Sequence, residues 1–445
     1  MKILISTLLF LSCQLASAQD YGSSKADSLL NAIEEHDEGM GSVAVLKDGQ
    51  LLYQKAYGFA EIKSKQKNNP ITLFRIGSIS KTYTATLVMK AVEEGLLKLD
   101  DKLSKFYPEF ENSDQISISH MLQHRSGLYN FTNSPFYVQY MTQAKTKSEM
   151  LEILLSTKNN FRPDEGHEYS NTAYVLLSYI LEDVYGLKYG DILKEKILVP
   201  LKLENTYFAK AIDQSANASV SYFRTAQWEV SPETNMMITM GAGGISATAK
   251  EVAIFYEALF NGEILEESSL SKMKEIKDGF GYGLFQMPYY DQKILGHTGG
   301  IDGFQSVAVH LESENLTVVI LCNAVSYKRN DILLGLLAAY FGKEFEIPDF
   351  KAGVALQREE LIDFEGVYSS ETFPLKITIS IADNSQLMAQ ATGQSAFPLT
   401  AINPYSFKFD PAGIKIVFDS ENSLLTLEQN GMKFKLKKEV ESTDD

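Results

Sequence analysis

The sequence of 445 residues predicts an α+β domain followed by a small all-β domain. Strand patterns at both ends of the first region enclose a mostly helical middle, from about residue 115 to 265. From about Asp363 the chain changes to short strands separated by turn residues, as in a small barrel or sandwich. Because a single core usually stops growing near ~250 to 300 residues, we divide the chain into a domain at 19–345, a linker at 346–362 and a β domain at 363–445.

The first elements follow from local signals. Residues 24–36 are predicted to form a helix, and "SVAVLKDGQLLYQKAYGFA" alternates on either side of Asp48-Gly49, which is a strong hairpin signal. Residues 78–95 form the next predicted helix, with apolar positions on one face and Gly95 as its stop.

The later elements are predicted in the same way. Strands return at "YGLFQMPYY", "KILGHTGG", "FQSVAVHLE" and "LTVVILCNA", and a helix over about 330–341 closes the first domain. The β domain is predicted to contain "GVYSS", "LKITISIA", "QLMAQAT", "SFKFD", "IKIVFD", "LLTLEQ" and "KFKLKK".

Composition excludes several classes of protein. With 44% hydrophobic and 22% charged residues, the chain is typical of a globular protein rather than a disordered or fibrous one. The formal net charge is -16 and no run of basic residues occurs, which argues against nucleic acid as a partner, because a phosphate backbone is bound by clustered Lys and Arg.

The first residues, "MKILISTLLFLSCQLASAQ", are typical of an export signal. We expect a signal peptide at 1–18, cleavage after Ala18 and a periplasmic or secreted protein; lipidation of Cys13 is a rival interpretation. No later segment is apolar enough to span a membrane. Cleavage leaves Cys322 as the only cysteine, so no internal disulfide can form, and the apolar run around Cys322 predicts an inert buried thiol.

A Ser-x-x-Lys pair is a weak catalytic signal, because this chain contains it four times. Three of the pairs, Ser64/Lys67, Ser269/Lys272 and Ser271/Lys274, lie in polar or charged stretches and are predicted to be at the surface. Only Ser78/Lys81, in "FRIGSISKTYTA", combines an apolar entry with the start of a helix, where residues three apart share a face.

The chemistry of a nucleophile explains why such a pair would matter. A serine hydroxyl becomes a good nucleophile when a base takes its proton, and burial near a helix N-terminus disfavours the charged form of Lys81. The same helix start offers the backbone N–H of Ser78 to an oxyanion. The alternative is that Ser78 is a helix cap and Lys81 a solvated first-turn residue.

Two further segments bear on this choice: "YSNTAY", which holds Tyr169-Ser170-Asn171, and "GHTGGIDGF", which holds His297-Thr298-Gly299-Gly300. Together with "FRIGSISKTYTA", "ISISHMLQHRSGL" and "GAGGISATAKEVAIFYEAL", these two segments occur in the order typical of a known family. The sequence resembles the serine β-lactamase and penicillin-binding protein superfamily, on the branch of class C β-lactamases, D-aminopeptidases, D-alanyl-D-alanine carboxypeptidases and related esterases. The resemblance covers roughly residues 25 to 342. The C-terminal region more weakly resembles the lipocalin-like domains appended to some members.

The resemblance implies a β-lactamase/transpeptidase-like fold, with an antiparallel sheet flanked by helices plus a helical subdomain. It also implies a role for each matching residue. Ser78 would be acylated, with Lys81 as its base or proton relay. Tyr169 would shuttle a proton to and from the leaving group, for which its phenol needs a pKa lowered by Lys81. Asn171 would hold the acyl-side amide of the substrate. The backbone N–H groups of Ser78 and Gly300 would bind the oxyanion, beside Thr298.

His297 departs from the usual pattern of the family, in which the third motif is Lys-Thr-Gly. β-Lactamases and carboxypeptidases use that Lys to help bind the substrate carboxylate, and a neutral imidazole does so less well. D-Aminopeptidases and some esterases of the branch have His at this position. We therefore expect poor β-lactamase activity.

Other features have structural interpretations. His120 and His124 are four residues apart, but no Glu follows His120 as in a zinc motif, so we interpret both as structural polar residues. The glycines of "GAGGIS" lack the spacing of a phosphate loop and predict a tight backbone turn near the active site. The triplets "NFT", "NAS" and "NLT" receive no functional weight. We expect no metal and no cofactor.

Two hypotheses of function remain. The first is an exported serine hydrolase that acts through an acyl-enzyme on small amides, esters or peptides, such as D-amino-acid peptides. The second is a penicillin-binding or sensing protein of the same fold that is acylated without turnover. The first is favoured because all three segments retain groups able to do chemistry. Whether the β domain restricts access to the site stays open.

Overall fold

The computed structural model describes residues 21–208, 211–225, 227–289, 292–348, 350, 356–382, 385–409, 412–419, 422–429 and 432–439. The predicted signal peptide, its cleavage site at Ala18 and Cys13 lie outside the described residues. The chain divides into two compact units, and the division follows Pro348. Within the described ranges, no helix has both the length and the apolar content needed to cross a membrane.

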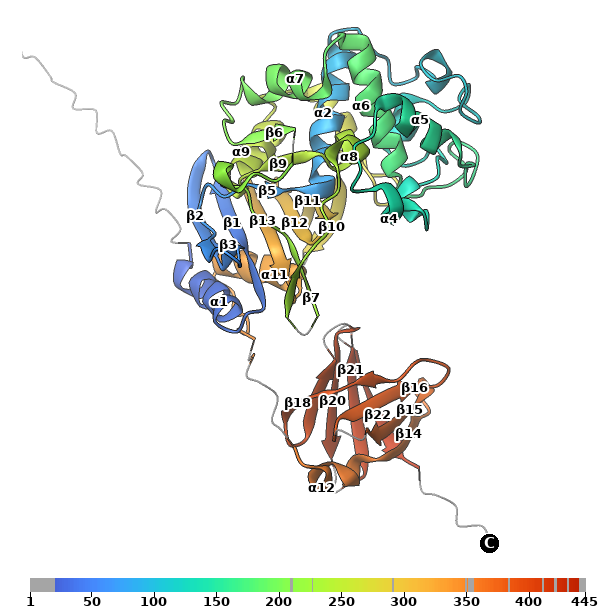
Figure 1. Cartoon of the computed structure of the whole chain (residues 1–445). Coiled ribbons are helices and arrows are strands. Elements are labelled where there is room, and N and C mark those ends of the chain that lie inside the picture. Colours follow the sequence, from blue (N-terminus) through green and yellow to red (C-terminus); the bar gives the residue numbers. More distant parts are fainter. Residues whose placement is uncertain are drawn as a thin grey trace, which may run out of the picture. The chain divides into compact units, whose positions relative to one another are not determined.

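The first unit is built on a six-stranded antiparallel sheet whose strands come from both ends of the unit (Figure 1). In spatial order the strands are β10 (Phe285–Tyr289), β11 (Gln292–Ile301), β12 (Phe304–Leu311), β13 (Leu316–Val325), β1 (Gly39–Lys47) and β2 (Gln50–Tyr57). The predicted hairpin forms because Asp48 and Gly49 both adopt positive φ, at 50° and 75°, which matches the twist of a tight two-residue turn.

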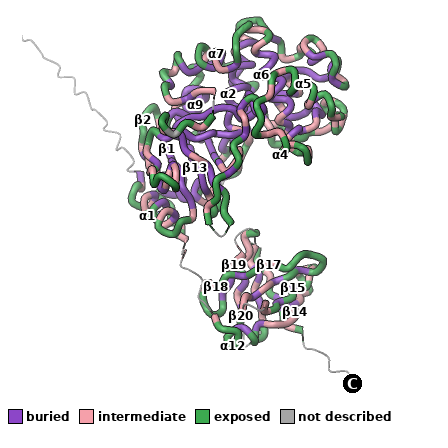
Figure 2. The backbone as a smooth tube through the Cα atoms, in the orientation of Figure 1, coloured by how far each residue is buried: buried purple, intermediate pink, exposed green. Residues whose placement is uncertain are grey.

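Helices cover both faces of this sheet, which explains why β1 and β13 are almost entirely buried (Figure 2). One face carries α1 (Ser23–Glu35) and α11 (Arg329–Tyr340), and the other carries α9 (Ala249–Phe260). A strand buried on both faces has no polar side, so these strands show long apolar runs such as "VVIL" rather than strict alternation.

The helical part of the unit surrounds α2 (Ser80–Glu93), which is buried along most of its length. Its neighbours in space include α6 (Asn171–Tyr185) and α8 (Met236–Gly243). The remaining helices are α3 (Ile118–Leu122), α4 (Tyr137–Tyr140), α5 (Lys147–Leu155), α7 (Tyr189–Leu193) and α10 (Glu267–Met273). A small sheet of β5 (Phe74–Arg75), β9 (Ile245–Ala247) and β6 (Thr206–Phe208) leads into α2.

The second unit is a nine-stranded antiparallel sheet with its own apolar core. In spatial order its strands are β17 (Phe397–Pro398), β16 (Leu387–Ala391), β15 (Phe373–Ile381), β14 (Gly366–Ser370), β22 (Met432–Lys438), β21 (Leu424–Gln429), β20 (Ile414–Asp419), β19 (Ser406–Phe409) and β18 (Thr400–Asn403). The first and last strands in this order follow one another in the chain, and Phe397 of β17 stacks on Phe409 of β19 at 4.5 Å. The sheet is therefore curled into a nearly closed barrel.

The predicted fold class is confirmed: an α+β domain with an antiparallel sheet, flanking helices and a helical subdomain, followed by a barrel-like β domain. The two short strands β17 and β18 were not predicted, because two to four residues are too few to show a period.

Candidate active site

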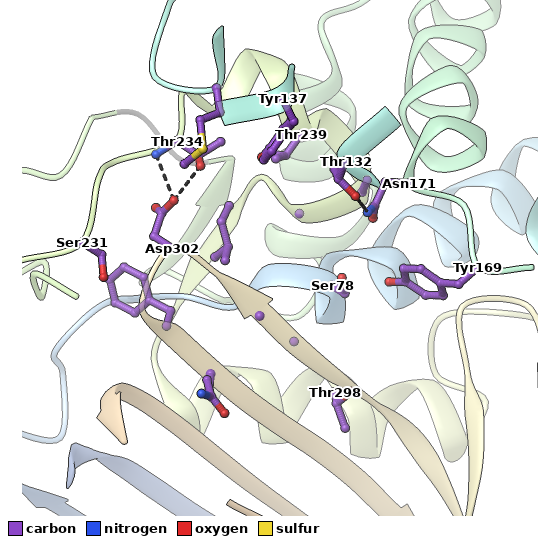
Figure 3. Close-up of a pocket in the computed structure, with 18 of the residues that line it drawn as sticks. Ser78, Thr132, Tyr137, Tyr169, Asn171, Ser231, Thr234, Thr239, Thr298 and Asp302 are labelled. Atoms are coloured by element: carbon purple, nitrogen blue, oxygen red, sulfur yellow. Dashed lines mark hydrogen bonds between the residues drawn. The ribbon is translucent and has the colours of Figure 1, made fainter. Parts of the chain in front are cut away.

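The residues predicted to form a site gather at one cavity of about 900 Å³ in the first unit (Figure 3). The cavity is lined by Ser78, Tyr169, Asn171, His297, Thr298 and Gly300, among others. Lys81 lies directly behind Ser78 and is fully buried. A larger cavity of about 1030 Å³, lined by Tyr189, Phe208 and Met240 among others, contains none of these residues.

Ser78 lies on a short 3₁₀ turn, Gly77–Ile79, and α2 begins after it at Ser80. Ser78 therefore precedes the helix instead of capping it, and no side-chain cap is present. Ser78 is partly exposed at the cavity, whereas its neighbours Gly77 and Ile79 are buried. The apolar entry noted in the sequence buries the turn and leaves the serine at the cavity wall.

Lys81 makes three hydrogen bonds that bear on its protonation state. Its Nζ lies 2.7 Å from Oδ1 of Asn171, 2.7 Å from the carbonyl oxygen of Ala242 and 3.1 Å from Oγ of Ser78. Burial lowers the pKa of Lys81 well below its usual value. A neutral amine has two N–H groups and one lone pair, and the two N–H groups must donate to the two oxygens that can only accept. The lone pair is then left for the O–H of Ser78.

The Ala242 carbonyl reaches Lys81 because α8 approaches α2 very closely. A Cβ added to Gly241 would lie 2.7 Å from Oγ1 of Thr84, so this approach requires glycine. The backbone bends sharply one residue earlier, where Met240 adopts φ 37° and ψ -131°. The sequence predicts a tight backbone turn at "GAGGIS". In the structure this segment instead forms the end of α8 and the start of β9, and Gly241 allows the close approach to α2.

Tyr169 also lies beside the serine, and its hydroxyl points toward Ser78 (Figure 3). The Nζ of Lys81 lies 4.8 Å from the centroid of the Tyr169 ring. Burial raises the pKa of the Tyr169 phenol, and a hydrogen bond with Ser78 only partly offsets the rise. The expected lowering of this pKa by Lys81 is therefore wrong. The physical reason is that burial also keeps Lys81 neutral, so the amine supplies little positive field to the phenol.

Asn171 is engaged at both ends of its side-chain amide. Its Oδ1 accepts from Lys81, and its Nδ2 donates to Oγ1 of Thr132 at 3.0 Å. Its backbone N–H donates to Oδ1 of Asn130 at 3.1 Å. The "NFT" triplet, which received no functional weight, therefore supplies two residues that support the site. Its sequence carries no catalytic signal, because a surface loop can contain the same three residues.

The backbone of Ser78 lies beside the strand that carries Gly300. Glycine is required at position 77 for two reasons. A Cβ there would lie 2.8 Å from the backbone nitrogen of Gly300, and the backbone has φ 53°, which disfavours residues with a side chain. The two N–H groups that the family resemblance assigns to the oxyanion hole are thus carried by adjacent segments.

His297 is buried, and its ring stacks on Phe285 at 4.2 Å. Burial and the neighbouring Lys81 lower the pKa of His297 to about 3. Its Nδ1 lies 2.5 Å from the carbonyl oxygen of Thr298 and must donate, because a carbonyl cannot. The imidazole is therefore neutral and places no positive charge where the Lys-Thr-Gly pattern has one.

Arg329 supplies a cation at a different part of the cavity wall. It lies at the start of α11, and its guanidinium donates to the carbonyl oxygen of Gly299 at 3.0 Å. Asp302 also lines the cavity but is held by buried Arg75 at 3.0 Å and by Thr234. Sequence reasoning missed Arg329, because it lies far along the chain in a stretch with no motif.

Other candidates from the sequence lie away from this cavity. Ser64, Ser271 and Lys272 are exposed, whereas Ser269 is buried on α10, contrary to expectation. Cys322 is buried beside Tyr57, as predicted, and burial raises the pKa of its thiol to about 11. Over the described ranges, no group of three or more His, Cys, Asp or Glu side chains is arranged to hold a metal ion.

Fold and site together define a class: proteins with a Ser-x-x-Lys pair at the start of a buried helix, beside the edge of an antiparallel sheet. The Beta-lactamase family model matches residues 29–340, and the chain belongs to this family. Penicillin-binding protein 4* of Bacillus subtilis (strain 168) is 26% identical over 350 residues, which cover 72% of this chain and 77% of that protein.

Solved structures share the fold. The octameric penicillin-binding protein homologue from Pyrococcus abyssi has a TM-score of 0.68 at 24% identity and covers 93% of this chain and 100% of its own, a likeness that concerns fold alone. The D-amino acid amidase from Ochrobactrum anthropi SV3, complexed with D-phenylalanine, has a TM-score of 0.62 at 25% identity and covers 72% of this chain and 99% of its own.

Proposed function

We propose that the protein is a serine hydrolase that acts through a Ser78 acyl-enzyme on small amides or esters, such as derivatives of D-amino acids. The observation that carries the proposal is the hydrogen bonding of Lys81. Its amine is fully buried, has a lowered pKa and directs its lone pair at the hydroxyl of Ser78. A base already neutral beside a serine is what nucleophilic catalysis requires.

The proposed acylation follows from these contacts. Oγ of Ser78 attacks the substrate carbonyl carbon as its proton passes to Nζ of Lys81, and the N–H groups of Ser78 and Gly300 stabilise the oxyanion. When the intermediate collapses, the bond to the leaving group breaks. The Tyr169 phenol donates its proton to that leaving group and recovers one from Lys81, so both residues end in their starting states. The raised pKa of Tyr169 supports the role of a protonated donor.

Deacylation reverses these roles. A water molecule attacks the acyl carbon and passes its proton to the neutral base, and Oγ of Ser78 leaves with a proton returned to it. The acid product departs and the hydroxyl of Ser78 is restored. Each step uses groups that line or adjoin the cavity.

The substrate class is inferred from charge. His297 is neutral and its Nδ1 is occupied by Thr298, so this position supports a neutral leaving group better than a carboxylate. The similarity to a D-amino acid amidase supports amides of D-amino acids among the candidates. Efficient hydrolysis of penicillins is not expected.

A second candidate is favoured by Arg329. A guanidinium at the cavity wall suits a substrate with a free carboxylate, which supports a carboxypeptidase or a penicillin-binding protein acylated without rapid turnover. The similarity to penicillin-binding protein 4* of Bacillus subtilis points the same way.

One substrate panel separates the candidates. We would measure kcat/KM for D-alaninamide, a D-alanine ester, D-alanyl-D-alanine and a simple penicillin, with Ser78→Ala as the control. The first proposal predicts at least tenfold preference for the neutral amide or ester over the dipeptide. The opposite preference, reduced by Arg329→Met, would support the carboxypeptidase. A stable penicillin adduct with no turnover of any ester would support the binding protein.

We also infer from the first 18 residues that the protein is exported to the periplasm or secreted. The intact mass of the protein from its host tests this. A mature chain that begins at Gln19 supports cleavage after Ala18, and a chain that begins at a lipid-modified Cys13 would replace this inference with a lipoprotein.

A further inference from the structure

His124 is a buried residue that the proposed chemistry does not use. It follows the short helix α3, is 1% exposed and has a left-handed backbone at φ 56°. From the sequence it was interpreted, like His120, as a structural polar residue. The structure distinguishes the two, because His120 closes a capping box at the start of α3 whereas His124 lies against Tyr169.

Two hydrogen bonds from this one residue flank Tyr169 in the chain. Nδ1 of His124 accepts from the backbone N–H of Ser170 at 3.1 Å, and its carbonyl oxygen accepts from the backbone N–H of Glu168 at 2.9 Å. Between these bonds, the imidazole packs on the Tyr169 ring with centroids 4.5 Å apart. The residues before and after the phenol, and the ring itself, are therefore held by a single side chain and its backbone.

The Ser170 bond identifies the tautomer of His124. A backbone N–H can only donate, so Nδ1 carries the lone pair and the proton lies on Nε2. Burial, with Lys81 and His297 nearby, lowers the pKa of His124 well below its usual value, so the neutral form persists. The acceptor is thus available at neutral pH.

The same contacts reach the start of α6. The Ser170 side chain accepts from the backbone N–H of Ala173 and caps the helix, and Asn171, the acceptor for Lys81, is the next residue. A shift of the Ser170 backbone would therefore move both the phenol and the amide oxygen that orients the base.

We propose that His124 is a positioning residue that clamps Tyr169 and the start of α6 against Ser78. This proposal rests on the proposed function of Tyr169 as proton donor. A displacement near 1 Å of a group that transfers a proton can reduce turnover by about 10²-fold. Apolar packing alone would fill the same space without fixing the Ser170 backbone.

The test compares substitutions of His124 with a matched control. His124→Asn retains an acceptor near the position of Nδ1 and tolerates a left-handed backbone, whereas His124→Gln moves the acceptor by one methylene and His124→Leu removes it. His120→Leu is the control, because it loses a comparable histidine contact with a backbone N–H, that of Ser117 at 3.4 Å, on the helix that precedes His124. Each rate is divided by the concentration of active sites, which is measured by titrating Ser78 with a fluorophosphonate.

The clamp predicts a specific pattern in turnover. His124→Leu and His124→Gln should lower kcat by about 10- to 100-fold with KM changed less than threefold, and His124→Asn should recover most of the rate. His120→Leu should stay within about twofold of the wild type. Equal rates in His124→Asn and His124→Gln, or a kcat in His124→Leu close to that of the control, would overturn the proposal. If His124→Leu does not fold, the comparison of kcat between His124→Asn and His124→Gln tests the proposal.

A second measurement separates this claim from the proposed function. In protein labelled with ¹³C-tyrosine, Tyr169→Phe identifies the ring resonance of Tyr169. The clamp predicts that His124→Gln shifts or broadens this resonance and that His120→Leu does not, whether or not a substrate has been found. An unchanged resonance overturns the clamp. A different result would count against the proposed function alone: the Tyr169 resonance shifts in His124→Gln, but fluorophosphonate does not label Ser78 of the wild-type protein.

Discussion

Nζ of Lys81 lies 3.1 Å from Oγ of Ser78, while its other two hydrogen bonds go to oxygens of Asn171 and Ala242 that can only accept. This arrangement gives the neutral amine one orientation, with its lone pair toward the serine. The fold supplies it by packing α6 and α8 against α2 and against each other.

Lys81→Met should lower kcat/KM for a small ester by about 10³-fold, because general-base catalysis typically contributes 10² to 10⁴. Lys272→Met is the matched control, since it removes the lysine of another Ser-x-x-Lys pair, at an exposed position. The measurement is steady-state hydrolysis of a p-nitrophenyl ester by protein shown to be folded by circular dichroism. Equal activity in the two variants would show that Lys81 is not the base.

The dependence of kcat/KM on pH should reflect the lowered pKa of Lys81. The amine is an active base only when neutral, so activity is lost as pH falls through that lowered pKa and is retained above it. The profile should therefore show its acid limb well below 10.5, the usual lysine value. Activity that rises only near pH 10 would mean that the buried amine is charged in the folded protein.

Gly77→Ala should reduce activity by at least about 10²-fold, because the added Cβ would lie 2.8 Å from the Gly300 nitrogen and disturb the oxyanion contacts. Gly95→Ala is the control: Gly95 also has positive φ, at 73°, but its Cβ would meet nothing within 4 Å. Both variants should lose about 1 kcal/mol of stability from backbone strain. The prediction fails if both retain wild-type kcat/KM.

Acid should destabilise the fold through two buried histidines. The pKa is about 3 for His297 and about 4 for His310, against 6.5 in the unfolded chain, so the unfolded state binds more protons as pH falls. Their contribution to the free energy of unfolding is fully present above pH 6.5 and is lost toward pH 4. Between pH 7.5 and pH 5 the loss is about 2 kcal/mol for each histidine.

Urea unfolding at these two pH values measures the effect. His310→Phe keeps a ring against Phe260, on which His310 stacks at 4.5 Å, but it cannot take up a proton. The difference in unfolding free energy between the two pH values should shrink by about 2 kcal/mol in this variant. An unchanged difference would exclude His310 as a source of the acid sensitivity.

The order of helices and strands could be predicted from sequence because its signals are local. The Asp48-Gly49 turn and the period of each strand are of this kind. The choice of Ser78 over the other Ser-x-x-Lys serines rested on the apolar residues before it, and these bury the turn that presents it.

The rest of the site depends on contacts between distant segments. The Ala242 carbonyl has no side-chain signature, and its approach to Lys81 depends on how closely α8 packs against α2. Thr132 was overlooked because a hydroxyl in a loop is common, and its role appears only when the loop meets Asn171. The pKa of Tyr169 was predicted in the wrong direction because burial cannot be read from three residues of sequence.

The most direct test of the account is the intact mass of the protein, followed from milliseconds to hours after mixing with a p-nitrophenyl ester and, separately, with a simple penicillin. The account predicts a transient acyl adduct from the ester, mapped to Ser78 by peptide digestion, absent in Ser78→Ala and retained in Ser271→Ala. An adduct that persists in Ser78→Ala, or ester turnover that continues in that variant, would contradict it.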